Sequence, residues 1–107
     1  KDIYIFSATK YSHPIQRSFY IGKNGISKMV FPECSNKRTQ DLEPAYHDAG
    51  QFYWGKIKKW KKGKNLHSEA LGFKVKKYKF VDIDDKDDLE FAKIVFSGKK
   101  NLKNKSY

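Results

Sequence analysis

A single cysteine, few arginines and no long apolar run set the first limits on this 107-residue chain. The lone Cys34 has no partner for an internal disulfide, which indicates a reducing compartment, so we expect a cytoplasmic protein. No apolar segment approaches the roughly 18 residues of a membrane span, and no signal-peptide pattern is present. The sequence therefore gives no support for a membrane protein or for secretion. Cys/His spacings typical of zinc sites and glycine-rich phosphate loops are also missing.

The shortage of arginine matters because the chain is otherwise strongly basic, with a formal net charge of +11. Sites that read a nucleic-acid sequence usually rely on arginine, whose planar guanidinium can make two hydrogen bonds to one base. Here many of the lysines fall in two runs, residues 56–64 and 99–105, as on a solvated surface. This composition disfavours nucleic acid and suits a small anionic substrate. A basic module that binds nucleic acid or an acidic partner is kept as an alternative.

Aromatic residues are plentiful, at 16% of the chain, and can supply the core of one small domain. Residues 2–7 are nearly all apolar, which predicts a strand covered on both faces. Proteins rarely begin with their most buried strand, so we expect an N-terminal portion to precede this chain. Without it, the apolar faces would be wet, and we expect self-association.

The remaining elements follow from turn chemistry and periodicity. Residues 8–14 are expected to be a loop, and residues 15–31 predict a β-hairpin around the turn Gly22-Lys23-Asn24-Gly25. A strand is expected at 51–54, a short helix at 56–62 and a half-exposed or edge strand at 72–80. A last helix is expected at 86–96, with a frayed basic tail at 97–107. Asp85 is its expected N-cap, and its expected inner face comprises Leu89, Ala92, Val95 and Phe96.

Residues 38–55 hold a varied group of polar side chains that a plain surface or core segment does not need. Arg38 can clamp a carboxylate or a phosphate, and Gly50 lets a ligand approach the backbone closely. Hydrogen bonds to sugar hydroxyls and amides are within the chemistry of Tyr46, His47 and Asp48. The alternative is a loop with capping side chains and a solvated His47.

Asp82 and Asp84 stand two residues apart at the end of an expected strand. Alternate residues of a strand point to the same face, roughly 6.5 Å apart. Two such carboxylates can bind one Mg²⁺ ion, and α/β folds carry their sites at strand ends. The alternative is an acidic turn that only caps the last helix, a role already expected of Asp87 and Asp88 together with surface exposure.

Three stretches, taken together, resemble the acylneuraminate cytidylyltransferases. The first is Gln40-Asp41-Leu42 followed by Ala45-Tyr46-His47-Asp48-Ala49-Gly50-Gln51-Phe52-Tyr53-Trp54-Gly55, which is most similar to the branch acting on pseudaminic acid. The second, Pro14-Ile15-Gln16-Arg17, resembles the family's entry into its hairpin. The third, Val81-Asp82-Ile83-Asp84 with Asp88-Leu89-Glu90-Phe91-Ala92, resembles its metal-binding Asp-Ile-Asp and the helix that follows.

The resemblance implies an α/β chain that forms the C-terminal half of a Rossmann-like nucleotidyltransferase domain, with the hairpin as a dimerisation extension. The implied homodimeric enzyme joins CMP from CTP to the anomeric hydroxyl of a nine-carbon keto-sugar acid and releases pyrophosphate, for surface-glycan or flagellin glycosylation. Pseudaminic acid is the first candidate sugar and sialic acid the alternative. Asp82 and Asp84 would hold Mg²⁺. The sugar pocket would be lined by Gln16, Arg17, Gln40, Tyr46, His47, Asp48, Gln51 and Tyr53, with Arg38 meeting an anionic group.

One part of the family pattern has no counterpart here. The Gly/Arg/Lys-rich loop that grips CTP belongs to the family's N-terminal half and is absent from these residues. We therefore expect this chain alone to bind CTP poorly and to be inactive. The order Glu43-Pro44 also reverses the Pro-then-acid order of the family.

Overall fold

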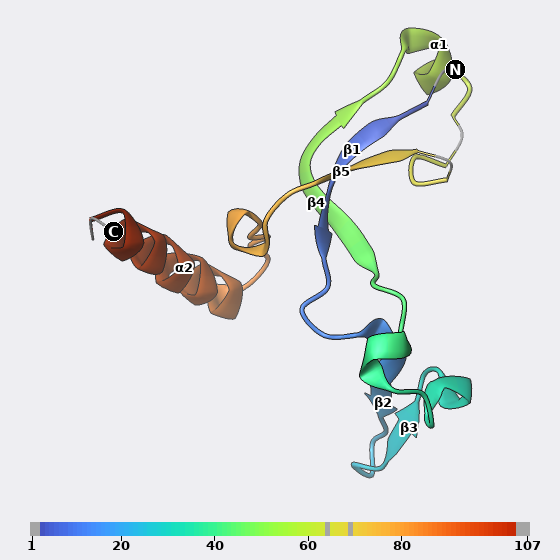
Figure 1. The fold of residues 1–107 in the computed structure, drawn as a ribbon. Coiled ribbons are helices and arrows are strands. Elements are labelled where there is room, and N and C mark those ends of the chain that lie inside the picture. Colours follow the sequence, from blue (N-terminus) through green and yellow to red (C-terminus); the bar gives the residue numbers. More distant parts are fainter. Residues whose placement is uncertain (1–2, 64, 69, 105–107) are drawn as a thin grey trace.

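A computed structural model describes residues 3–63, 65–68 and 70–104. It is a mixed α/β structure with a three-stranded sheet, a separate two-stranded hairpin and a long C-terminal helix (Figure 1). The strands and α-helices are, in chain order, β1 (Ile5–Lys10), β2 (Phe19–Ile21), β3 (Ser27–Met29), β4 (Tyr46–Trp54), α1 (Ile57–Lys61), β5 (Leu71–Lys74) and α2 (Lys86–Asn104).

The sheet has the order β4-β1-β5, so the apolar N-terminal strand lies at its centre. β4 pairs with β1 antiparallel, and β5 pairs with it in parallel. Ser7, Ala8 and Thr9 of β1 are buried, because the strand has a neighbour on each edge. β1 begins and ends later than predicted, and its last residues occupy the start of the expected loop at 8–14.

The pairing of β1 with β4 contains a wide bulge, and this irregularity shapes the site. Phe6 pairs with Tyr53 and Ala8 with Asp48, so only Ser7 of β1 lies opposite residues 49–52 of β4. Ser7 is fully buried, and its hydroxyl accepts hydrogen bonds from the backbone amides of Gln51 at 3.0 Å and Phe52 at 3.4 Å. A small hydroxyl side chain at the bulge therefore satisfies amides that the ladder leaves unpaired.

The hairpin forms around the predicted turn, but its first strand is shorter than expected. Ile15–Arg17 is a 3₁₀ turn, not a strand, because Pro14 starts a tight turn in which the Arg17 amide bonds to its carbonyl. Only Phe19–Ile21 and Ser27–Met29 pair as β2 and β3. The turn closes with the Gly25 amide on the Gly22 carbonyl at 2.9 Å.

The C-terminal half corrects three expectations. β5 lies at an edge as predicted, but it ends at Lys74, and a 3₁₀ turn (Lys77–Lys79) follows. Asp82 and Asp84 therefore follow a turn and do not end a strand. α2 continues through residue 104, and four of residues 97–104 are the good helix formers lysine and leucine, so the tail expected at 97–104 is wrong; residues 105–107 lie outside the described ranges.

The start of α2 is capped as expected. The Asp88 amide donates to Oδ1 of Asp85 at 2.8 Å, and Oδ2 of Asp88 accepts from the Asp84 amide at 3.0 Å and the Asp85 amide at 3.3 Å. The expected inner face is not packed into a core, since Phe96 is 70% exposed and Leu89 43%. Figure 1 shows α2 standing apart from the sheet. In the described part of the chain, no helix has both the length and the apolar character to cross a membrane.

The structure is open, which leaves many apolar side chains exposed. Its Cα radius of gyration is 18.1 Å, whereas a compact domain of this size has about 13 Å. A second small cluster lies at the far end of the sheet, where the Tyr4 hydroxyl donates to the Lys59 carbonyl and its ring packs on Trp60 at 4.7 Å. The short helix expected at 56–62 is confirmed as α1, and Trp60 is its contact with Tyr4.

Candidate functional site

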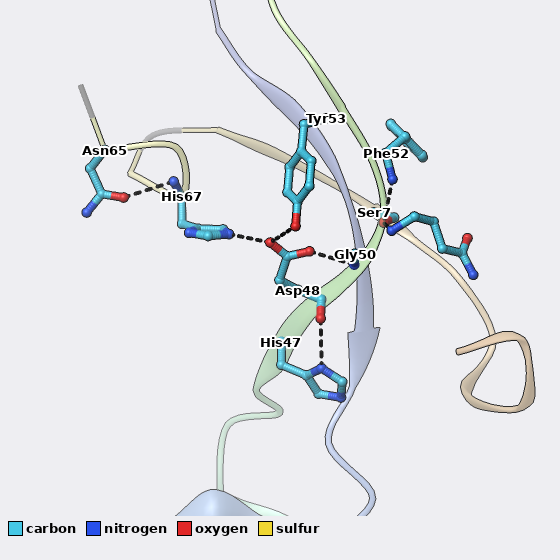
Figure 2. A network of polar contacts seen from close by, with 9 residues as sticks. Ser7, His47, Asp48, Gly50, Phe52, Tyr53, Asn65 and His67 are labelled. Carbon is cyan, nitrogen blue, oxygen red and sulfur yellow. Dashed lines mark hydrogen bonds and ion pairs between the residues drawn. The ribbon is translucent and has the colours of Figure 1, made fainter. Parts of the chain in front are cut away.

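Among the described side chains of the sheet, the polar group with the most hydrogen-bond partners is Asp48, near the start of β4 (Figure 2). Its Oδ1 accepts the Gly50 amide at 2.7 Å, and its Oδ2 accepts the Tyr53 hydroxyl at 2.8 Å and Nε2 of His67 at 2.7 Å. An ionised carboxylate only accepts hydrogen bonds, so Nε2 of His67 carries the hydrogen. Three donors thus fix both oxygens of one partly exposed carboxylate.

These contacts set the protonation states of Asp48 and Tyr53. Burial on its own raises the pKa of Asp48. Hydrogen bonds from His67, Tyr53 and Gly50 lower it by more than burial raises it, so the pKa lies below its ordinary 3.8. The hydrogen bond to Asp48 raises the pKa of Tyr53, as do burial and the charges of Asp48 and Asp82. At neutral pH, Asp48 is therefore a carboxylate and Tyr53 a neutral phenol.

Asp48 stands between two cavities. The larger has a volume of 510 Å³ and lies over the sheet, lined by Phe6, Ala8, Tyr46, His47, Asp48, His67, Gly72 and Lys74. The smaller, of 310 Å³, is lined by Asp48, Ala49, Gly50, Tyr53, Phe80, Val81 and Asp82. The expected sugar-binding segment and one of the two expected metal ligands therefore border a common space.

His47 is held from three sides rather than solvated. Its Nδ1 donates to the Asp48 carbonyl at 3.1 Å, and its ring packs edge-on against Tyr11 and Phe80 at 4.8 and 4.9 Å. Beside it, the ammonium of Lys74 lies 5.1 Å from the Tyr46 ring. The larger cavity thus combines aromatic walls with one cation, which suits an anionic ligand that carries apolar groups.

Gly50 and Gln51 determine the backbone conformation near the smaller cavity. Gly50 has a φ of +66° and a Cβ added there would meet nothing within 4 Å, so the position requires glycine for its left-handed conformation. The Gln51 side chain donates to the Lys79 carbonyl at 2.6 Å and ties β4 to the turn that precedes Asp82. Its predicted sugar contact stays a prediction.

The other predicted sugar-binding residues lie at the hairpin end and line neither cavity around Asp48. Arg17 donates to the carbonyls of Cys34 and Lys37, and Gln16 donates to the Glu43 carbonyl at 3.1 Å. Arg38 meets the carboxylate of Asp41 at 2.9 Å, on the exposed 3₁₀ turn that also carries Gln40. Within this chain, Gln16 and Arg17 tie the start of the hairpin to the segment that follows it.

Asp82 and Asp84 differ in surroundings. Asp82 lines the smaller cavity, and its charge reaches Tyr53. The Asp84 amide donates to Oδ2 of Asp88 in the first turn of α2, and Asp84 does not line that cavity. Among the described residues, neither carboxylate accepts a hydrogen bond, and no three metal-binding side chains gather. Carboxylates are ligands that a hard cation takes, and the Mg²⁺ ion that these two are expected to share stays a prediction.

Sequence reasoning missed His67, Lys74 and Ser7. His67 belongs to the connection between α1 and β5, where no periodic pattern marks it, and it meets Asp48 across 19 residues. Nothing in the sequence distinguishes Lys74 from the many other lysines expected at the surface. Ser7 carries a weak signal, a hydroxyl within an apolar strand, which is typical of a bulge or a buried turn.

The chain was compared with known proteins. No family model matches the chain. Two pseudaminic acid cytidylyltransferases of Campylobacter jejuni, from serotypes O:23/36 and O:2, are each 41% identical over 96 residues, which is 87% of this chain and 40% of each relative. A Helicobacter pylori protein named pseudaminic acid cytidylyltransferase and UDP-2,4-diacetamido-2,4,6-trideoxy-beta-L-altropyranose hydrolase is 42% identical over 66 residues, 62% of this chain and 12% of that protein.

The chain therefore spans less than half the length of the curated relatives it matches. Of the residues that carry the resemblance, Tyr46, His47, Asp48 and Asp82 line the two cavities, whereas the motif at 14–17 lies at the hairpin end. By sequence, the chain is similar over 87% of its length to proteins named pseudaminic acid cytidylyltransferase, which agrees with the family that its motifs indicate.

Proposed function

We propose that the full-length protein is a cytidylyltransferase that joins CMP from CTP to a nine-carbon keto-sugar acid, with pseudaminic acid as the substrate. The anomeric oxygen of the sugar bonds to the α-phosphorus of CTP, the bond from that phosphorus to pyrophosphate breaks, and the hydroxyl proton is released. The product would serve surface-glycan or flagellin glycosylation. The buried lone cysteine supports a cytoplasmic location.

The observation that carries the proposal is the shared cavity of Asp48, Gly50, Tyr53 and Asp82. It sets a candidate metal ligand beside fixed hydrogen-bonding groups, which is what joining a sugar hydroxyl to a phosphate requires. The carboxylate of Asp48 orients the Tyr53 phenol, and the phenol oxygen can accept from a sugar hydroxyl. In the neighbouring cavity, Lys74 can attract the carboxylate of a sugar acid, and the rings of Phe6 and Tyr46 can pack on its apolar parts.

Asp82 and Asp84 would hold Mg²⁺ in this proposal. When bound, the ion would neutralise phosphate charge and lower the pKa of the attacking hydroxyl. The chain's own groups would bind and orient the sugar: Tyr53 and the Asp48 carboxylate behind it fix a hydroxyl, and the open backbone at Gly50 lets the sugar approach closely.

The test uses the full-length protein with CTP, Mg²⁺ and pseudaminic acid, with pyrophosphate release and CMP-sugar mass as readouts. Asp82→Asn and Asp84→Asn should each lower the rate about 100-fold or more, because charge stabilisation at the reacting phosphate is lost. Asp87→Asn, an exposed carboxylate in the first turn of α2, is the matched control. Full activity in both variants would refute the metal assignment.

The same assay separates the alternatives. A higher kcat/KM with N-acetylneuraminic acid than with pseudaminic acid would reassign the protein to the sialic acid branch. A wild-type protein that forms no CMP-sugar with either acid, but binds random duplex DNA in a salt-dependent way, would replace the enzyme by the basic binding module.

A further inference from the structure

His67 lies outside the residues that the family resemblance singles out, yet its imidazole is fixed from several sides. Nε2 donates to Oδ2 of Asp48 at 2.7 Å, and the ring meets Phe6 edge-on at a centroid distance of 4.8 Å. Its backbone amide donates to the Asn65 side chain at 3.0 Å, which holds the local turn. A half-exposed histidine with only a surface role needs none of these three restraints.

The contact with Asp48 continues to Tyr53. Oδ2 of Asp48 accepts from both His67 and Tyr53, so the two donors share one oxygen (Figure 2). The phenol hydrogen is committed to Asp48, and the lone pairs of its oxygen are left for other donors. Tyr53 lines the smaller cavity together with Asp82. Without His67, the carboxylate loses one of its three donors and can rotate, and the phenol follows it.

We propose that His67 is a positioning residue, which holds Tyr53 through the Asp48 carboxylate so that the phenol oxygen accepts a hydrogen bond from the sugar acid beside Asp82. The functional half of this inference rests on the proposed cytidylyltransferase activity. Its structural half, the coupling of His67 to the Tyr53 ring, stands on the contacts alone. His67 does not itself touch the reacting atoms in this assignment.

Three substitutions separate the donor from the bulk of the side chain. His67→Gln places an amide hydrogen near the position of Nε2, whereas His67→Asn is too short to do so and His67→Ala removes the group. His13→Ala is the matched control, since His13 is exposed and has no polar partner within the described ranges. All four variants are made in the full-length protein, and circular dichroism checks that each is folded.

The kinetic readout compares the change in the KM for the sugar acid with the change in the KM for CTP. His67→Ala and His67→Asn should raise the KM for the sugar acid about tenfold, as expected for one misplaced hydrogen bond, with the KM for CTP within about twofold of wild type. His67→Gln should recover most of the loss. In a double-mutant cycle with Tyr53→Phe, the two losses should be strongly non-additive. Additive losses, or a glutamine variant as impaired as the alanine variant, would overturn the proposal.

The second readout needs no reaction. Carbon-13 relaxation of the Tyr53 ring in the ligand-free protein should show an ordered ring in wild type, in His67→Gln and in the His13→Ala control. In His67→Ala and His67→Asn the ring should be mobile. An equally ordered ring in every variant would refute the inference even if the protein makes CMP-sugar. If wild type makes none, the proposed function fails, and this measurement still decides whether His67 positions Tyr53.

Discussion

The hydroxyl of Tyr53 lies 2.8 Å from the carboxylate of Asp48, although the two residues belong to one strand and are five positions apart. A regular strand would separate them by about 16 Å and point them to opposite faces. They meet because residues 49–52 bulge out opposite Ser7 and because Gly50 adopts a left-handed conformation. A break in sheet regularity thus assembles the candidate site.

The bulge makes Gly50 sensitive to substitution. Gly50→Ala should lower the free energy of unfolding by about 1 to 2 kcal/mol, because a left-handed backbone is unfavourable for any residue with a Cβ. It should also weaken sugar binding, since relief of the strain moves the Gly50 amide away from Asp48. Urea unfolding of the full-length protein and sugar titration calorimetry measure the two effects.

Gly25 supplies the control for this prediction. It also has a positive φ, of +81°, and open space around it, but it lies in the hairpin turn away from both cavities. Gly25→Ala should therefore cost similar stability and leave sugar binding unchanged. Equal losses of sugar affinity in the two variants would show that the bulge geometry has no special role.

The Asp48 network predicts how stability depends on pH. Its folded pKa lies below the ordinary 3.8, so the fold binds this proton more weakly than the unfolded chain does. The stabilisation is complete above about pH 3.8 and is lost as the pH falls through the lower folded pKa. Asp48→Asn should flatten this part of a plot of unfolding midpoint against pH. An unchanged acid limb would exclude the network as its origin.

At alkaline pH, the contribution of Tyr53 to stability falls as the pH rises, which is opposite to the trend for Asp48 at acidic pH. Hydrogen bonding to Asp48 raises the pKa of Tyr53, so the fold holds the phenol proton more tightly than the unfolded chain. This stabilisation is present below pH 10.0 and is lost as the pH rises through the higher folded pKa. Tyr53→Phe should remove that component, whereas Tyr20→Phe in the exposed hairpin should not. Absorbance titration of the phenolate and thermal unfolding above pH 9 together check the prediction.

Elements with local signals could be predicted from the sequence. The turn at Gly22–Gly25, the short helix around Trp60 and the cap at Asp85 all depend on residues within a few positions of one another, and each is confirmed. A strand near the start of the chain was also predicted from its apolar run, although β1 occupies Ile5–Lys10 and not residues 2–7. Tyr46, His47, Asp48 and Asp82 stood out by residue type and spacing, and the family resemblance then assigned them roles.

The features that local patterns missed depend on contacts between distant residues. The bulge exists only because β1 and β4 pair in a shifted register, and neither strand alone encodes that shift. His67 reaches Asp48 only after α1 and β5 have folded back along the sheet. The alternation of lysine and apolar residues at 72–80 suggested a long strand, but β1 offers partners only as far as Val75, whose amide bonds to Ala8.

The paired capping bonds of Asp85 and Asp88 predict a measurable effect on α2. Asp85→Ala and Asp88→Ala should each lower its stability by about 1 kcal/mol, because backbone amides at the helix start lose their acceptors. Asp87→Ala removes a charge from the same turn without removing an acceptor, so it should cost less. Helical circular dichroism during urea unfolding distinguishes the three. An Asp87 variant as unstable as the other two would show that charge alone is responsible.

The hairpin predicts self-association of the protein. Phe19, Tyr20, Ile21 and Ile26 are between 55% and 70% exposed, and a second copy could cover them. Ile21→Lys combined with Ile26→Lys should therefore shift the full-length protein towards monomer in sedimentation velocity. Ile94→Lys combined with Phe96→Lys adds the same charges to exposed apolar positions of α2 and is the control. Dissociation by the α2 pair alone would move the interface to the helix, and a wild-type protein that is already monomeric would contradict the dimerisation role of the hairpin.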